Sequence, residues 1–254
     1  MKKGTGLILA AMIFMGCFMT PAYAAPLQLL SPLAGEVAYP EGSAVDSAKF
    51  LLTYAYPQVT PETDTDTTIN AFYQELLDDL TQLTAPMMYD EASASLDDGV
   101  SAYMHINYQI MANTDEFFSV LLTQEQFMGV AESQTLLANV FARTGDSAGG
   151  LVTLPYILGI SEEDEASATK LVDAVYRLVW DIIVEQMQTG TVDYFEELTE
   201  ENLFAEFYPE SDFYLDEQGN IVFFVQPATV ANAAAGALSF PFSPDELRNE
   251  MNKN

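Results

Sequence analysis

The sequence predicts an α+β fold: an antiparallel sheet meander with helices packed on one side, in two intimately joined subdomains. Long segments repeat apolar residues at helical spacing, and shorter ones alternate apolar with polar residues as half-buried strands do. Apolar residues make up 49% of the chain and aromatic residues 12%, which is typical of a packed protein and not of a disordered one.

The N-terminal segment predicts export. Two lysines precede an apolar run, and Ala22 and Ala24 occupy the small-residue positions that signal peptidase reads. We expect residues 1–24 to be a signal peptide cleaved after Ala24, which would make the protein secreted or periplasmic. The alternative is a lipoprotein acylated at Cys17, although Phe14 is a poor match to the aliphatic residue expected there. The apolar run is shorter than a membrane-spanning helix requires and no later stretch is long enough, so we expect no transmembrane segment.

The next part of the chain predicts a strand, a helix and a meander. Residues 25–47 carry three prolines and two glycines without periodicity, which indicates a leader or tether. An N-terminal domain is expected over residues 48–150, with a strand at 49–56, a helix that ends at Ala85-Pro86, and three or four antiparallel strands after it. The helix is predicted from a stripe of apolar residues at helical spacing, namely Ile69, Phe72, Tyr73, Leu76, Leu80 and Leu83.

The second half predicts a long helix, a hairpin, a further strand and a short final helix. The long helix follows a capping sequence at 161–164, carries a wide apolar face and ends at Gly190. A hairpin over 213–225 precedes an alanine-rich segment, and an alternating strand over 238–242 follows it. A second capping sequence, at 243–246, starts the last helix.

The charge of the chain limits its partners. The chain has 38 acidic and 8 basic residues, for a formal net charge of −30. Export would remove two lysines, leaving 6 basic residues against 38 acidic ones and a net charge of −32. Such a protein repels phosphate, which argues against a nucleic acid partner and against anionic membrane surfaces. A cationic partner would be attracted at low salt; the alternative is that the acidic residues only keep a secreted protein soluble.

The sequence contains few residues for metal or nucleophilic chemistry. Cys17 would leave with the signal peptide and His105 is the only histidine, so we expect no metal site and no cofactor. His105 lies in an alternating segment and is interpreted as structural, and no nucleophile elbow accompanies it. Adjacent carboxylates are abundant, but a glycosidase needs two of them facing each other across a cleft, which a sequence does not reveal.

The order of several motifs resembles a known family. A Tyr-Pro-Gln strand end at 56–58 precedes a helix that carries Ile69-Asn70, and an aromatic hairpin precedes a ten-residue segment from Pro227 to Gly236. Over residues 48–250 this is similar to the RsiV-like extracytoplasmic family, which includes the outer domain of the anti-sigma factor RsiV and the non-catalytic region of the deacetylase PdaC. The resemblance implies that residues 48–150 and 151–254 correspond to the two adjoining domains of that family, whose functions are unknown.

The resemblance implies a non-catalytic binding or sensing module that captures a cationic, cell-wall-directed protein such as a lysozyme. Its candidate binding residues here are Glu132, which stands where the family often has histidine, and Pro227, Thr229, Asn232 and Gly236 of the ten-residue segment. Departures from the family motif include Ala228, Thr229 and Asn232, where the family has tyrosine, glutamate and proline. The small residues suit a tight connection between two strands, and Gly236 suits a backbone conformation that other residues avoid. The alternative function is a carboxylate-based enzyme acting on cell-wall or other polysaccharide.

Overall fold

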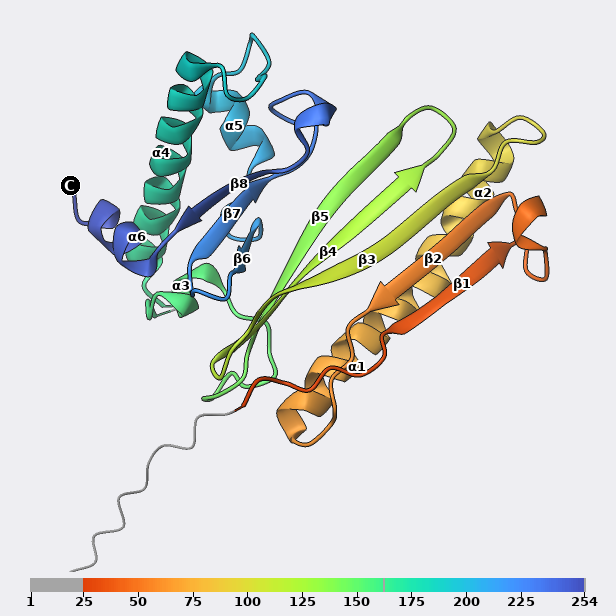
Figure 1. Cartoon of the computed structure of the whole chain (residues 1–254), viewed down its shortest axis with the longest axis horizontal. Helices are drawn as coiled ribbons and strands as arrows, with labels where there is room; N and C mark the ends of the chain where they lie inside the picture. Colours follow the sequence, from red (N-terminus) through yellow and green to blue (C-terminus); the bar gives the residue numbers. More distant parts are fainter. Residues whose placement is uncertain (1–24, 162, 254) are drawn as a thin grey trace, which may run out of the picture.

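The computed structural model describes residues 25–161 and 163–253 and has the predicted α+β fold (Figure 1). It contains a five-stranded sheet in the order β1-β2-β3-β4-β5 and a three-stranded antiparallel sheet in the order β6-β7-β8. The expected signal peptide, its cleavage site and Cys17 lie outside the described residues. The five-stranded sheet is mixed and not purely antiparallel as predicted, because β2 and β3 run parallel.

The first half of the chain forms the five-stranded sheet and its covering helices. The strands are β1 (Leu33–Tyr39), β2 (Phe50–Tyr56), β3 (Ala102–Asn113), β4 (Phe117–Phe127) and β5 (Glu132–Ala142). The helices are η1 (Val45–Ser47), α1 (Asp64–Asp79), the π-helical turn η2 (Leu80–Thr84) and α2 (Ala85–Ser95).

The expectation of a tether over residues 25–47 is wrong for its central part. Residues Leu33–Tyr39 form β1, which pairs antiparallel with β2 along its whole length, from Leu33 opposite Tyr56 to Tyr39 opposite Phe50. The strand is only partly buried, so its sequence carries a weak apolar alternation, and its pairing with β2 is what holds it.

The predicted end of the first helix at Ala85-Pro86 is also wrong, because the helix continues to Ser95. Proline in a helix interior removes a hydrogen bond and crowds the preceding turn. Here the chain widens into the π-helical turn directly before Pro86, which accommodates the ring. Within this turn the carbonyl oxygen of Thr81 accepts a hydrogen bond of 3.2 Å from the Tyr39 hydroxyl. The long helical connection allows β3 to run parallel to β2.

One face of the five-stranded sheet packs on α1 and α2 to form the first core. Thr63 and Asp66 cap the start of α1, where each side chain bonds to the backbone of the other. The buried side chains of this core include Phe50, Leu52, Ile69, Tyr73, Met104, Phe118, Val120 and Phe141. The opposite face, which we call the outer face, points away from these helices (Figure 1).

The second half forms the three-stranded sheet, with α4 packed on one side of it. Its elements are α3 (Leu154–Ile157), α4 (Glu165–Thr189), α5 (Glu200–Glu206), β6 (Phe213–Leu215), β7 (Ile221–Val225), η3 (Ala233–Ala235), β8 (Leu238–Phe242) and α6 (Pro244–Met251). The alanine-rich segment connects β7 to β8, which pair as neighbours, as predicted. The buried side chains here include Leu171, Val175, Val179, Ile183, Phe213, Ile221, Phe223 and Phe240.

The two sheets pack directly on each other through a third, smaller core. Leu121 and Leu136 on the outer face contact Tyr214, Val222 and Phe224 of the three-stranded sheet. One hydrogen bond reinforces this contact: the fully buried Ser119 hydroxyl of β4 accepts from the Leu215 backbone N–H at 3.0 Å. The order of layers is therefore helix, sheet, sheet, helix.

Candidate functional site

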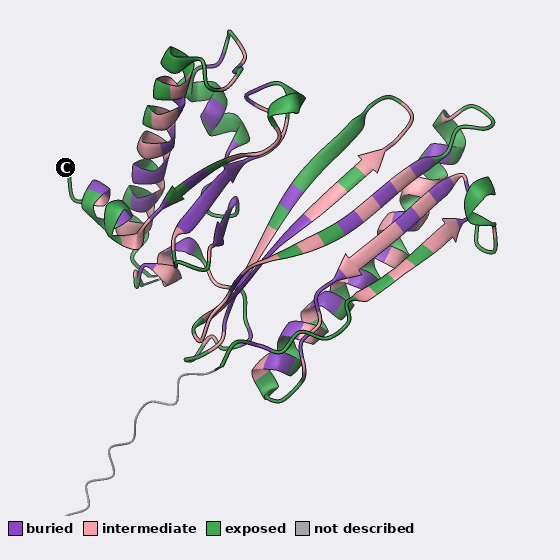
Figure 2. Cartoon of the chain, viewed as in Figure 1, coloured by how far each residue is buried: buried purple, intermediate pink, exposed green. Residues whose placement is uncertain are grey.

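The three-stranded sheet leaves part of the outer face open. Figure 2 shows exposed residues along the first half of β5, where the strands extend beyond the smaller sheet. Side chains on this face come from alternate residues of each strand, because a strand turns successive side chains to opposite faces. The open part carries Tyr103 and His105 from β3, Glu125 and Phe127 from β4, and Glu132 from β5.

An aromatic row runs across the open face. The Tyr103 ring stacks on His105 with centroids 4.5 Å apart and on Phe127 with centroids 5.9 Å apart. The Tyr103 hydroxyl donates a 2.6 Å hydrogen bond to Oε1 of Glu132, and this bond raises the pKa of the Tyr103 phenol. Nδ1 of His105 lies 2.5 Å from Oγ1 of Thr53. These contacts hold the Glu132 carboxylate and the imidazole in place on the sheet.

A cavity of about 320 Å³ lies between this face and the alanine-rich segment, and we call it the β5 cleft. Tyr103, Glu125 and Glu132, together with the next two residues of β5, form one wall. Pro227, Ala228 and Ala233 of the alanine-rich segment form the other wall. The cleft therefore presents two carboxylates and an aromatic ring on one side and small, uncharged side chains on the other, and no basic residue lines it.

Gln226 attaches the alanine-rich segment to the five-stranded sheet. Its side-chain amide accepts from the Leu136 backbone N–H and donates to the Leu136 carbonyl, both at 2.8 Å. The Gln226 amide thus bonds to β5 as a residue of a neighbouring strand would. Beyond it, the Thr229 hydroxyl donates to the Gln226 carbonyl at 2.7 Å, and Ala228 adopts a positive φ of 62°. This φ lies in the left-handed region, which is costly for any residue with a Cβ atom.

The predicted site residues do not all meet. Glu132 and Pro227 line the β5 cleft together, although they are far apart in the sequence. Thr229 lines a separate cavity beside α5, and Nδ2 of Asn232 donates a 2.5 Å hydrogen bond to Asp193. Gly236 has φ 67° and ψ −157°, a combination that is almost restricted to glycine, so its predicted backbone role agrees with the structure.

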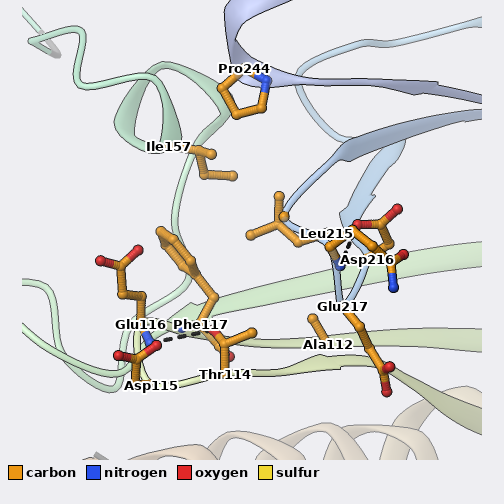
Figure 3. Close-up of a pocket in the computed structure, with 12 residues that line it drawn as sticks. Ala112, Thr114, Asp115, Glu116, Phe117, Ile157, Leu215, Asp216, Glu217 and Pro244 are labelled. Atoms are coloured by element: carbon orange, nitrogen blue, oxygen red, sulfur yellow. Dashed lines mark hydrogen bonds between the residues drawn. The ribbon is translucent and has the colours of Figure 1, made fainter. Parts of the chain in front are cut away.

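A second cavity, of about 310 Å³, lies where the β3–β4 and β6–β7 turns approach each other (Figure 3). Phe117, Ile157 and Leu215 form its apolar part. Asp216 uses its Oδ1 to accept from the backbone N–H groups of Gln218 and Asn220, at 2.9 and 2.8 Å, and so holds its own turn. None of the predicted site residues lines this cavity, whose carboxylates are Asp115, Glu116, Asp216 and Glu217.

Neither a cluster of metal-ligand side chains nor a membrane-spanning helix occurs among the described residues. Within residues 25–161 and 163–253, no three His, Cys, Asp or Glu side chains gather as metal ligands would. In the same part of the chain, no helix is both long and apolar enough to cross a membrane.

Two solved structures from the DUF3298 family, a family of domains of unknown function, share this fold. The Bacteroides fragilis member aligns with a TM-score of 0.54 and 14% sequence identity, over 90% of this chain and 98% of that chain. The Pseudomonas aeruginosa member aligns with a TM-score of 0.55 and 14% identity, over 88% of this chain and 94% of that chain. At this identity the likeness shows the fold alone, and it does not conflict with the RsiV-like resemblance. No family model and no curated protein matches the chain.

Sequence reasoning missed most of the residues that build the β5 cleft. Tyr103 and Glu125 were not singled out, although each belongs to an alternating strand whose partners place it on the face of Glu132. Gln226 carries no local signal, because its role depends on Leu136 in another sheet. Glu132 itself was selected only as a motif position, because the first four residues of β5 are all polar and show no apolar alternation that would mark the start of an edge strand.

Proposed function

We propose that this protein is a non-catalytic extracytoplasmic binding module of the RsiV-like family, and that its β5 cleft captures a cationic partner protein such as a lysozyme. The observation that carries the proposal is the meeting of Glu132 and Pro227, two motif positions from different halves of the chain, in one open cleft. The order of motifs over residues 48–250 supports the family, and the fold shared with the DUF3298 structures is compatible with it.

The charge of the cleft supports a cationic partner. Glu125 and Glu132 lie on adjacent strands of the open face, and no basic residue lines the cleft to neutralise them. Lys49 lies outside the cleft, where it donates to the carbonyl oxygens of Leu96 and Asp97 at 2.9 and 2.7 Å. The strongly negative net charge would accelerate association with a basic protein, while the cleft would determine which basic protein stays bound.

Capture of lysozyme by immobilised residues 25–254 tests the proposal, with a comparably basic protein, cytochrome c, as the control ligand. The double variant Glu125→Gln/Glu132→Gln keeps the shape of the cleft and removes its charge. The variant Asp181→Asn/Glu185→Gln removes the same charge from an exposed face of α4. We expect the cleft variant to lose about tenfold in lysozyme affinity and the α4 variant less than about twofold, because only the first removes charges that would face the partner.

Three results would contradict the proposal. Equal losses in the two double variants, or equal retention of cytochrome c, would reduce the binding to general ion exchange. Turnover of a glycan by the wild-type protein, abolished by neutralising a single carboxylate, would instead favour the polysaccharide enzyme.

A further inference from the structure

The strand β5 has an unpaired edge beside the cleft. It is the last strand of its sheet and pairs with β4 in unbroken register from Glu132 to Ala142. The backbone N–H and C=O groups of successive residues point to opposite sides of a strand. The backbone N–H and C=O of Leu136 both bond to Gln226 and point away from β4. The backbone N–H and C=O groups of all even-numbered residues of β5 therefore face the open side.

Part of this edge is already covered, but its beginning is not. The Val140 carbonyl accepts from Val152 at 2.8 Å, and the Ala142 N–H donates to Gly150 at 3.1 Å. Over the described residues, no backbone group bonds to Glu132 or Gln134 from the open side. Both residues are exposed and both line the β5 cleft. Two successive outward-facing residues thus offer their N–H and C=O groups to the cleft.

The opposite wall leaves space for another backbone. Paired strands lie about 4.7–4.9 Å apart, so a strand added here needs neighbours without bulky side chains. Pro227, Ala228 and Ala233 meet this requirement. The Gln226 amide, which contains the same donor and acceptor as a peptide bond, already occupies the equivalent position one step along the edge, at Leu136.

We propose that the β5 cleft binds an extended, basic segment of a partner protein by strand addition to β5 at Glu132 and Gln134. Every second side chain of the added strand would lie over the outer face, close to the carboxylates of Glu132 and Glu125. Lysine or arginine at alternate positions of the segment would therefore be favoured. This inference rests on the proposed function, since it specifies how the same cleft recognises its partner.

The inference is tested by amide hydrogen exchange of isotope-labelled residues 25–254. Exchange is measured with and without an eight-residue peptide of alternating lysine and threonine. We expect saturating peptide to slow exchange of the Glu132 and Gln134 amides by about tenfold or more, because these amides become hydrogen-bonded. The amides of Ser133 and Thr135 should change little, since they already face β4. Two further peptides carry N-methyl groups on alternate residues, one at the odd-numbered positions and the other at the even-numbered positions. Only one of the two should bind, because in the other the methyl groups replace the N–H groups that would bond to β5.

Two variants at one position isolate the backbone contribution. Gln134→Pro removes an N–H that faces away from β4, a position where an edge strand tolerates proline. Gln134→Ala removes the side chain and keeps the N–H. We expect peptide affinity to fall about tenfold in Gln134→Pro and less than about twofold in Gln134→Ala, with circular dichroism confirming that both variants fold. If Gln134→Pro unfolds, the N-methylated peptides carry the same test.

The outcomes separate this inference from the proposed function. Capture of lysozyme that depends on Glu125 and Glu132, without peptide binding or amide protection, would overturn strand addition and leave the function standing. Peptide binding with equal affinity in the two Gln134 variants and no protection of Glu132 would also overturn it. Peptide binding with protection at both amides, but no capture of lysozyme, would support strand addition and indicate a different basic partner.

Discussion

Replacing Ser119 by alanine should destabilise the contact between the two sheets by removing a fully buried side-chain hydrogen bond. Ser119 has no exposed surface, and its hydroxyl accepts from the Leu215 backbone N–H at 3.0 Å. Alanine is smaller by one oxygen atom, so the substitution does not crowd the core. It leaves a buried N–H without a partner, which costs about 1–3 kcal/mol. For a chain of this size, each kcal/mol corresponds to roughly 2–4 °C in Tm.

Urea unfolding of residues 25–254, followed by Trp180 fluorescence and by far-ultraviolet circular dichroism, measures this loss. Trp180 reports on α4 in the second half, whereas circular dichroism reports on both halves, so coincident transitions would show that the two sheets unfold together. Ser133→Ala is the matched control, because Ser133 is exposed, and it should change stability by less than about 0.5 kcal/mol. A loss in Ser119→Ala no larger than in the control would refute the reasoning, since the Leu215 N–H would then have found another partner.

Three further predictions concern the alanine-rich segment and a buried acid. Ala228→Gly should stabilise the protein by about 1 kcal/mol in thermal unfolding, because glycine adopts the observed φ of 62° without the Cβ clash; a destabilised variant would contradict this. Gln226→Ala should cost about 1–3 kcal/mol and speed exchange of the Leu136 amide, and unchanged exchange would count against the amide bridge. Burial raises the pKa of Asp212 above 3.8, although its carboxylate accepts from the Tyr208 N–H at 2.8 Å. Protonation of Asp212 therefore favours the folded state, so Asp212→Asn should be more stable than wild type at pH 7. This advantage should shrink as the pH falls through the raised pKa and should be gone below pH 3.8. A stability difference that stays constant across pH would exclude this origin.

Helix ends and special backbone conformations that depend only on neighbouring residues were predicted correctly. Ser243 and Glu246 form the expected capping box of α6, and Gly190 ends α4 with a φ of 65°. Gly236 adopts its glycine-specific conformation for the same reason: the requirement lies in its own backbone. Such features depend on side chains and dihedral angles within a few residues, which the sequence displays directly.

The errors concern elements whose structure depends on distant partners. The strand β1 has little apolar alternation and exists because β2 pairs with it. Pro86 ends no helix, because the preceding π-helical turn accommodates it. Helical residues both before and after Pro86 also pack in the first core against the five-stranded sheet. The parallel pairing of β2 with β3 follows from this longer helix, which carries the chain back to the other end of the sheet.

The sequence by itself determined the α+β class, the strongly negative charge and most helix ends, since composition and short-range caps decide these. Only the tertiary structure decided that Glu132 lies opposite Pro227, that Gln226 bonds to Leu136, and that the first residues of β5 keep an open edge. The physical reason is that strand order and the packing of one sheet on another arise from contacts between residues far apart in the chain, and short-range sequence patterns carry no information about them.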